Sequence, residues 1–133
     1  MSFEIINPDA LGRPSGWNNG LLGRAGGRVL FVAGQAAADA SGAVPPTSFT
    51  EQWDRALARV LEVVRAAGGA PEDIGRITVY VTDRSAYLAS RKPLGEIHRR
   101  HLGRHYPAMA LVEVHALVDP NALVEMEATA VLP

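Results

Sequence analysis

The 133-residue sequence contains no cysteine. This excludes disulfides, a thiolate nucleophile and any zinc site built on cysteine, and it fits a reducing compartment. The chain also lacks a long apolar run, because its densest apolar strand, VLFVA at 29–33, is far too short to cross a bilayer. The segment MSFEIINPDALG carries acidic residues and a proline where a secretion signal needs a basic start and an apolar stretch. We therefore expect a cytoplasmic protein with no membrane partner.

Strong charge of either sign is also missing, since the formal net charge is −1. Such a chain has no overall field that would concentrate nucleic acid, and this disfavours a nucleic-acid partner. The one basic cluster contains His98, His101 and His105, and the first two have a spacing compatible with shared metal ligation. The neighbouring Arg99, Arg100 and Arg104 would oppose a dication, so we expect no metal and interpret the cluster as a solvated helix end. No phosphate loop, nucleotide fingerprint or Ser-His-Asp order is present, and we expect no cofactor.

The first half of the chain predicts a strand over 3–7, a turn-rich loop over 8–20, and a β-hairpin made of 21–24 and 28–33. Gly34 and Gln35 are expected to end the second strand of that hairpin. Ser48 and Glu51 form a capping-box pattern before an apolar repeat at three- and four-residue spacing, which predicts a long helix. Gly68 and Gly69 supply its C-terminal stop.

The second half alternates in the same way. It predicts a β-branched strand over 77–82, a short turn or helix near 84–90, and a helix from about Lys92 that ends at Gly103. Two alternating strands, 108–118 and 123–131, follow and are joined by DPNA. The length fits a single domain over 1–133.

These elements predict an α+β sandwich in which two helices cover one face of a mainly antiparallel sheet. Strands 108–118 and 123–131 carry apolar residues on both sides. The face of the sheet without helices is therefore expected to be too apolar for water and to need a partner subunit.

Four segments in this order resemble the YjgF/RidA family of imine/enamine deaminases: FVAGQ (31–35), EQWDRALARVLEVVRAAGGAPEDIGRITVYVTD (51–83), YPAM (106–109) and VEMEATAV (124–131). The resemblance covers nearly the whole chain. It implies a chorismate-mutase-like α+β fold, a homotrimer, and a pocket between subunits that holds a small-molecule ligand.

The resemblance also identifies site positions, and several depart from the family pattern. Active deaminases of this family carry an arginine after the Pro-Ala step that clamps a substrate carboxylate, and here that position is Met109. The carboxylate that positions a water is retained as Glu125. The other implied substrate-binding positions are Trp17, Ala33, Gln35, Arg91 and Leu111, of which only Gln35 keeps the family's residue.

Each of these residues also has a plain structural interpretation. Met109 is either a soft pocket wall or a gap-filler at a subunit interface. Glu125 either orients a water or is an outward charge on a strand, and Arg91 either replaces the missing clamp or is solvated. Trp17 either covers a pocket or packs on a neighbouring subunit.

The sequence thus predicts a small-molecule hydrolase or deaminase that acts on an imine, enamine or related metabolite through a carboxylate-held water. Because Met109 cannot bind a carboxylate, a standard 2-iminoacid deaminase is not expected. The alternative is a non-catalytic trimeric module that binds a small metabolite or a protein, and RNA cleavage of the endoribonuclease type is the least favoured function.

Overall fold

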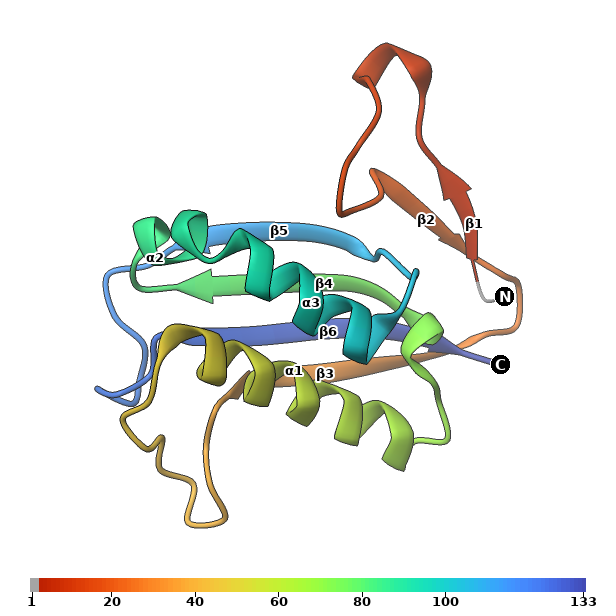
Figure 1. The fold of residues 1–133 in the computed structure, drawn as a ribbon. Coiled ribbons are helices and arrows are strands. Elements are labelled where there is room, and N and C mark those ends of the chain that lie inside the picture. Colours follow the sequence, from red (N-terminus) through yellow and green to blue (C-terminus); the bar gives the residue numbers. More distant parts are fainter. Residues whose placement is uncertain (1–2) are drawn as a thin grey trace.

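A four-stranded sheet with three helices on one face forms the body of the protein in the computed structural model, which describes residues 3–133 (Figure 1). The strand order is β3-β6-β4-β5. The helices are α1 (Phe49–Ala66), α2 (Arg84–Ala89) and α3 (Arg91–Leu102), and the four strands are β3 (Arg28–Ala36), β4 (Ile74–Val81), β5 (Ala108–Glu113) and β6 (Val124–Leu132). Single 3-10 turns lie at Asp9–Leu11 and Pro71–Asp73.

The longest helix, α1, begins and ends where the sequence indicates. The Ser48 hydroxyl accepts a hydrogen bond from the backbone N–H of Glu51, which satisfies one of the free amides of the first turn. After the last turn Gly68 has a φ of +87°, a conformation that other L-residues rarely adopt. The helix therefore stops at the predicted glycines.

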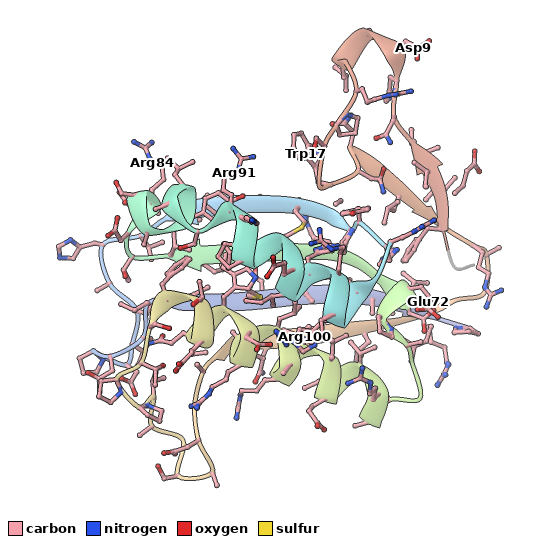
Figure 2. All side chains as sticks on the ribbon, viewed as in Figure 1. Asp9, Trp17, Glu72, Arg84, Arg91 and Arg100 are labelled. Carbon is pink, nitrogen blue, oxygen red and sulfur yellow. The ribbon has the colours of Figure 1, made fainter. Side chains whose placement is uncertain are left out.

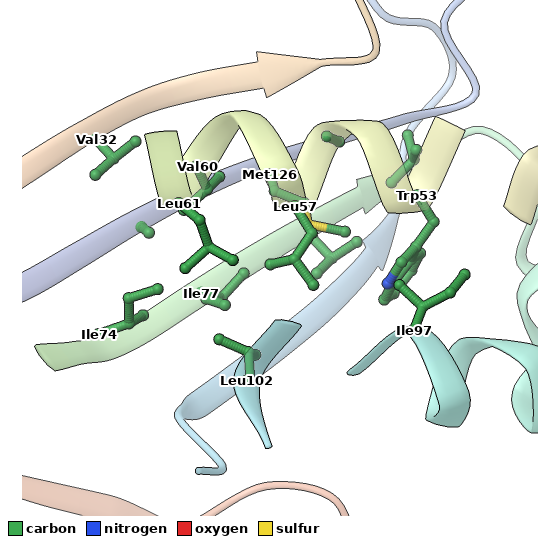
Figure 3. Close-up of a cluster of buried hydrophobic side chains, with 14 of the residues drawn as sticks. Val32, Trp53, Leu57, Val60, Leu61, Ile74, Ile77, Ile97, Leu102 and Met126 are labelled. Atoms are coloured by element: carbon green, nitrogen blue, oxygen red, sulfur yellow. The ribbon is translucent and has the colours of Figure 1, made fainter. Parts of the chain in front are cut away.

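The core lies between α1, α3 and the sheet (Figure 3). Leu57, Val60 and Leu61 of α1 pack on Ile77 of β4 and Met126 of β6, and all five are at most 3% exposed. This burial is the expected outcome of an amphipathic helix on a sheet, because each fully buried aliphatic side chain contributes about 1.5–3 kcal/mol. The predicted α+β class, a mainly antiparallel sheet with helices on one face, is confirmed.

The predicted hairpin of 21–24 and 28–33 is wrong. Strand β2 (Gly20–Gly23) pairs with β1 (Phe3–Ile6) in a separate two-stranded sheet, whereas β3 pairs with β6. Strand β3 also continues past Gly34 and Gln35 to Ala36, with a register irregularity between Val32 and Gln35. Alternation along a strand does not identify its partner, and the long-range pairing with β6 outweighs the local turn.

Strands β1 and β2 form an arm that extends away from the body (Figure 1). Its base is held by Phe3, which is buried and stacks on the His105 ring with centroids 6.3 Å apart. Gly75 permits this contact, because a Cβ there would lie 3.0 Å from Cζ of Phe3. The arm is thus attached to the body at a defined place.

The two C-terminal strands are not neighbours in the sheet, and the first of them is shorter than the predicted 108–118. β5 ends at Glu113 and runs parallel to β4, while β6 lies between β3 and β4 and is antiparallel to both. The intervening segment 114–123 is a loop. Gln52, which is 0% exposed, holds this loop by donating to the Asn121 carbonyl at 2.9 Å and accepting from the Leu123 N–H at 2.8 Å.

The open face of the sheet is only partly apolar. Its exposed apolar residues are on the edge strands, where Phe31 is 79% and Val29 is 56% exposed on β3 and Val112 is 42% exposed on β5. The central strand β6 presents Glu125, Glu127, Thr129 and Val131. The side of β6 that faces the helices is apolar throughout, whereas its open side combines Val131 with Glu125, Glu127 and Thr129. The need for a partner subunit on this face stays a prediction.

Among the described residues, no helix combines the length and the apolar composition needed to cross a membrane.

Candidate functional site

A cavity of about 550 Å³ opens beside β5, between the helices and residues 15–17, where the arm loop returns toward the body. Three parts of the chain that are far apart in the sequence form its walls: residues 15–17 of the arm loop, the helical segment 87–99, and Tyr106 to Leu111. Trp53 of α1 forms the inner end, because it is only 6% exposed. Trp17 hangs from the arm while Arg91 projects from the start of α3 on the same side of the molecule (Figure 2).

The cavity brings together four of the residues that the resemblance implies. Trp17, Arg91, Met109 and Leu111 all line it. Met109 and Leu111 point toward the helices, because they stand opposite Ile77 and Val79 of β4 and pack against the core. The thioether of Met109 thus faces the cavity as part of an apolar wall.

Aromatic rings dominate the rest of the lining. Trp53 stacks on Tyr87 with centroids 5.7 Å apart, and Tyr106 stacks on His98 at 4.7 Å with an interplanar angle of 11°. With Trp17 these rings present flat surfaces from α1, α2, α3 and the arm. Such surfaces favour a planar or apolar ligand body.

The charged residues of the lining are cations only. Arg91 and Arg99 line the cavity, and no aspartate or glutamate does. Neither arginine forms an ion pair with any residue in the range 3–133, whereas Arg100 on the same helix is paired with Asp54 at 3.1 Å. Arg99 lies along the helix above Gly95, where its Nη1 would be 3.7 Å from an added Cβ.

His98 contributes a neutral imidazole to the wall. Its Nε2–H donates to the His105 carbonyl at 2.9 Å. Burial lowers the pKa of His98 below 6.5, and the hydrogen bond to His105 only partly offsets this, while the charges of His105 and Arg99 lower it further. The imidazole is therefore neutral at pH 7, and its Nδ1 is an acceptor.

Asn18 attaches the loop that carries Trp17 to the start of β5. Its Nδ2 donates to the Tyr106 carbonyl at 2.7 Å, and its backbone N–H donates to the Pro107 carbonyl at 3.2 Å. Its Oδ1 in turn accepts from Nδ2 of Asn7 at 2.8 Å. These hydrogen bonds hold the arm loop in a defined position over the cavity, although the loop consists mainly of turn residues.

Glu125 lies elsewhere, on the open face of the sheet. It stands opposite Tyr80 of β4 and Ala36 of β3. Its carboxylate rests on the backbone of Gly34, where a Cβ would overlap it. Next to it Tyr80 donates its hydroxyl to Glu127 at 2.9 Å, and this hydrogen bond is the main reason that the pKa of Tyr80 is raised. This second cluster is acidic, in contrast to the cavity.

Ala33 and Gln35 are also outside the cavity. Ala33 is exposed in the irregular part of β3, beside Gly34. Gln35 stands opposite Met126, and its amide oxygen accepts a hydrogen bond from Nε of Arg59 on α1 at 3.1 Å. Within a single chain the sheet therefore lies between Glu125 and Ala33 on one side and the aromatic cavity on the other.

The three histidines of the basic cluster have separate partners. His98 donates to the His105 carbonyl, His105 donates to the Ile74 carbonyl at 2.6 Å, and His101 lies 2.5 Å from Asp54. Within residues 3–133 no group of three His, Asp or Glu side chains is arranged to hold a metal ion.

Several lining residues were not predicted as site residues, among them Trp53, Tyr106, Tyr87, His98 and Arg99. The first two were interpreted as part of the helix core and of the YPAM segment. The spacing of Arg91, His98 and Arg99 at seven and eight residues places them on one side of α3, and this periodicity could have grouped them.

Comparisons with known proteins place this fold. Residues 16–132 match the family described as Endoribonuclease L-PSP. A RutC family protein of Pyrococcus abyssi is 30% identical over 105 residues, which are 78% of this chain and 79% of that protein. The chain belongs to the YjgF/RidA family.

Relatives with named activities and solved structures agree with this assignment. The 2-iminobutanoate/2-iminopropanoate deaminase of Capra hircus is 30% identical over 78% of this chain and 73% of its own length. The Rid family protein YyfB of Yersinia pestis, whose function is unknown, is 33% identical with a TM-score of 0.86 over 99% of this chain and 100% of its own. The YjgF gene product of E. coli is 28% identical with a TM-score of 0.68, over 94% and 92%. The predicted family membership is confirmed.

Proposed function

We propose that this YjgF/RidA protein is a small-molecule hydrolase that converts an imine or enamine to a carbonyl compound and ammonia, with a water held by Glu125. The observation that carries the proposal is the position of this carboxylate. It lies on the central strand β6 and rests on Gly34, so the backbone on both sides holds it rigidly.

The reaction needs one base and two proton transfers to nitrogen. Glu125 accepts a proton from the water as the water oxygen attacks the carbon of the C=N bond, and the electrons of that bond move to nitrogen. This proton then reaches the nitrogen, which gives a neutral carbinolamine. Glu125 next takes the proton of the carbinolamine hydroxyl and passes it to the nitrogen as the C–N bond breaks, so that ammonia leaves, the C=O bond forms and Glu125 ends in its ionised state. An enamine first takes up a proton at carbon to become the imine. General-base assistance of this kind contributes about 10²–10⁴-fold to a rate.

The active assembly that we propose is a homotrimer with each site between two subunits. In one chain the cavity holds aromatic rings and cations, whereas Glu125 lies on the opposite face of the sheet. Another copy that covers the open face, including the exposed Phe31 and Val29, would place its own cavity against Glu125. This arrangement makes a complete site from two incomplete halves.

The test uses Glu125→Gln, which keeps the shape and removes the base. For an imine that the unmodified protein hydrolyses, we expect turnover by Glu125→Gln to fall by about two to four powers of ten, while sedimentation velocity still shows the trimer. Glu127→Gln is the matched control, because Glu127 is on the same face and bonds to Tyr80. Unchanged turnover in folded Glu125→Gln would refute the role of Glu125, and a monomer at micromolar concentration would refute the site between subunits.

A non-catalytic module that binds a small metabolite is the second candidate, and one residue favours it. Met109 gives β5 no cation to hold a substrate carboxylate. Under this hypothesis ligands bind to the cavity, but no imine is hydrolysed faster than in buffer, with or without Glu125. Some similar proteins are named endoribonucleases, but we still favour a small-molecule ligand over RNA. The lining of the cavity offers no extended basic groove for a nucleic acid.

A further inference from the structure

We infer that the cavity recognises an aromatic carboxylate, whose ring lies among the aromatic side chains and whose acid group is held by Arg91 and Arg99 of α3. This inference rests on the proposed function in one respect: it takes the cavity as part of the proposed site and names the chemical class of the substrate that binds there. The carboxylate is thus held from a helix and not from β5, where Met109 stands.

The charge of the lining supports an anion. Arg91 and Arg99 are the ionised side chains of the cavity wall, and no acidic residue of the wall neutralises them. Both are also without an ion pair among residues 3–133, while Arg100 of the same helix is neutralised by Asp54. A guanidinium is a planar donor that matches a carboxylate with two parallel hydrogen bonds.

Helix geometry puts the two cations on the same side. Arg91 and Arg99 are eight residues apart on α3, and His98, which directly precedes Arg99, also lines the cavity. The Arg99 side chain runs back along the helix toward Gly95, where its Nη1 lies 3.7 Å from the position that a Cβ would take, an ordinary contact distance. Since His98 is neutral, it adds an acceptor and no further charge.

Size and shape support a ring. The cavity of about 550 Å³ lies within the range for drug-sized ligands, roughly 300–1,000 Å³. A four-carbon imino acid would leave most of it to water. Trp17, Trp53, Tyr87 and Tyr106 offer flat faces, and Met109 offers a deformable one.

Calorimetric titration of the full chain tests this with three probes: 2-naphthoate, its neutral counterpart 2-naphthamide, and acetate. We expect 2-naphthoate to bind at least about tenfold more tightly than either of the others. The difference from 2-naphthamide measures the charge-assisted contact of the carboxylate, and the difference from acetate measures burial of the ring. Equal affinity for naphthoate and naphthamide would overturn the anion site, and equal affinity for acetate would overturn the aromatic site.

Variants locate the acid group. Arg91→Gln and Arg99→Gln should each weaken 2-naphthoate by about tenfold and leave 2-naphthamide unchanged. Arg84→Gln is the matched control, because Arg84, at the start of α2, projects in the same direction as Arg91 in Figure 2 but does not line the cavity. An equal loss of affinity for 2-naphthoate in Arg84→Gln would show that the positive charge of the surface in general attracts the anion, and it would overturn the proposed carboxylate site.

The outcome is separable from that of the proposed function. Naphthoate binding that follows this pattern, with no imine hydrolysed, would refute the hydrolase and keep the aromatic-acid site. Hydrolysis of imines that depends on Glu125, at rates that 2-naphthoate does not inhibit, would keep the hydrolase and refute the aromatic-acid site.

Discussion

Asn18→Ala should release the arm loop from the cavity without unfolding the body. The substitution removes two side-chain hydrogen bonds, to the Tyr106 carbonyl at 2.7 Å and from Asn7 at 2.8 Å. Each contributes about 0.5–1.5 kcal/mol net, so docking of the loop should weaken by about 1–3 kcal/mol. This corresponds to a roughly 5- to 150-fold increase in the opening equilibrium of the loop.

Hydrogen–deuterium exchange followed by mass spectrometry measures this opening directly. Peptides that cover 14–24 should exchange faster by that factor. Peptides from α1 should not change, because the hydrogen bonds of Asn18 go to Asn7, Tyr106 and Pro107, outside α1. Asn19→Ala is the matched control, since the Asn19 side chain makes no hydrogen bond within the described part of the chain, and only its backbone N–H donates to Asn7. Equal acceleration in both variants, or none in Asn18→Ala, would refute the assignment of Asn18 as the anchor of Trp17.

Three further outcomes are expected. Gln52→Leu should lower the free energy of unfolding by about 1–3 kcal/mol in urea titration, because it removes two part-buried hydrogen bonds, to the Asn121 carbonyl and from the Leu123 N–H, and an unchanged midpoint would contradict this. The folded state lowers the pKa of His98, so the unfolded chain binds the proton first: stability is full above pH 6.5 and falls as the pH drops from there toward the folded-state pKa. His98→Gln, which retains a donor, should flatten this slope in denaturation curves between pH 7.5 and 5. Finally, hydrolysis of 2-iminobutanoate should be slower by roughly two orders of magnitude than in a relative with the arginine. Met109 offers no charge-assisted contact on β5, and a four-carbon acid is too small to contact the aromatic walls that would position its carboxylate at Arg91 and Arg99. Comparable rates in a coupled assay would contradict this and show that these arginines hold a small acid equally well.

Local patterns were sufficient for the helices. The capping box at Ser48, the apolar repeat that follows and Gly68 predicted α1 almost to the residue, because capping and amphipathicity act within a few turns. The predicted break between a short helix near 84–90 and a helix from about Lys92 matches α2 and α3, and Pro93 lies in the first turn of α3, where a proline is tolerated. The ordered family segments then added the fold class and the positions of the site.

Pairing could not be obtained in the same way. The alternation of 21–24 and 28–33 fits a hairpin as well as it fits the observed partners, β1 and β6. The strands 108–118 and 123–131 likewise alternate without revealing that β6 inserts between β3 and β4. A strand's sequence records which side is buried, but its neighbour is chosen by contacts far along the chain.

The sequence by itself determined the helices, the side of each strand that is buried, and the chemical inventory: a retained carboxylate at Glu125, a thioether at Met109, and no cysteine. Only the tertiary structure decided which of these groups meet. Because β5 runs parallel to β4, Met109 and Leu111 face the helices and share a cavity with Trp17 and Arg91. Because β6 pairs antiparallel with β4, Glu125 falls on the opposite face. A side chain's face follows from register and strand direction, and these are set by long-range pairing that no local pattern contains.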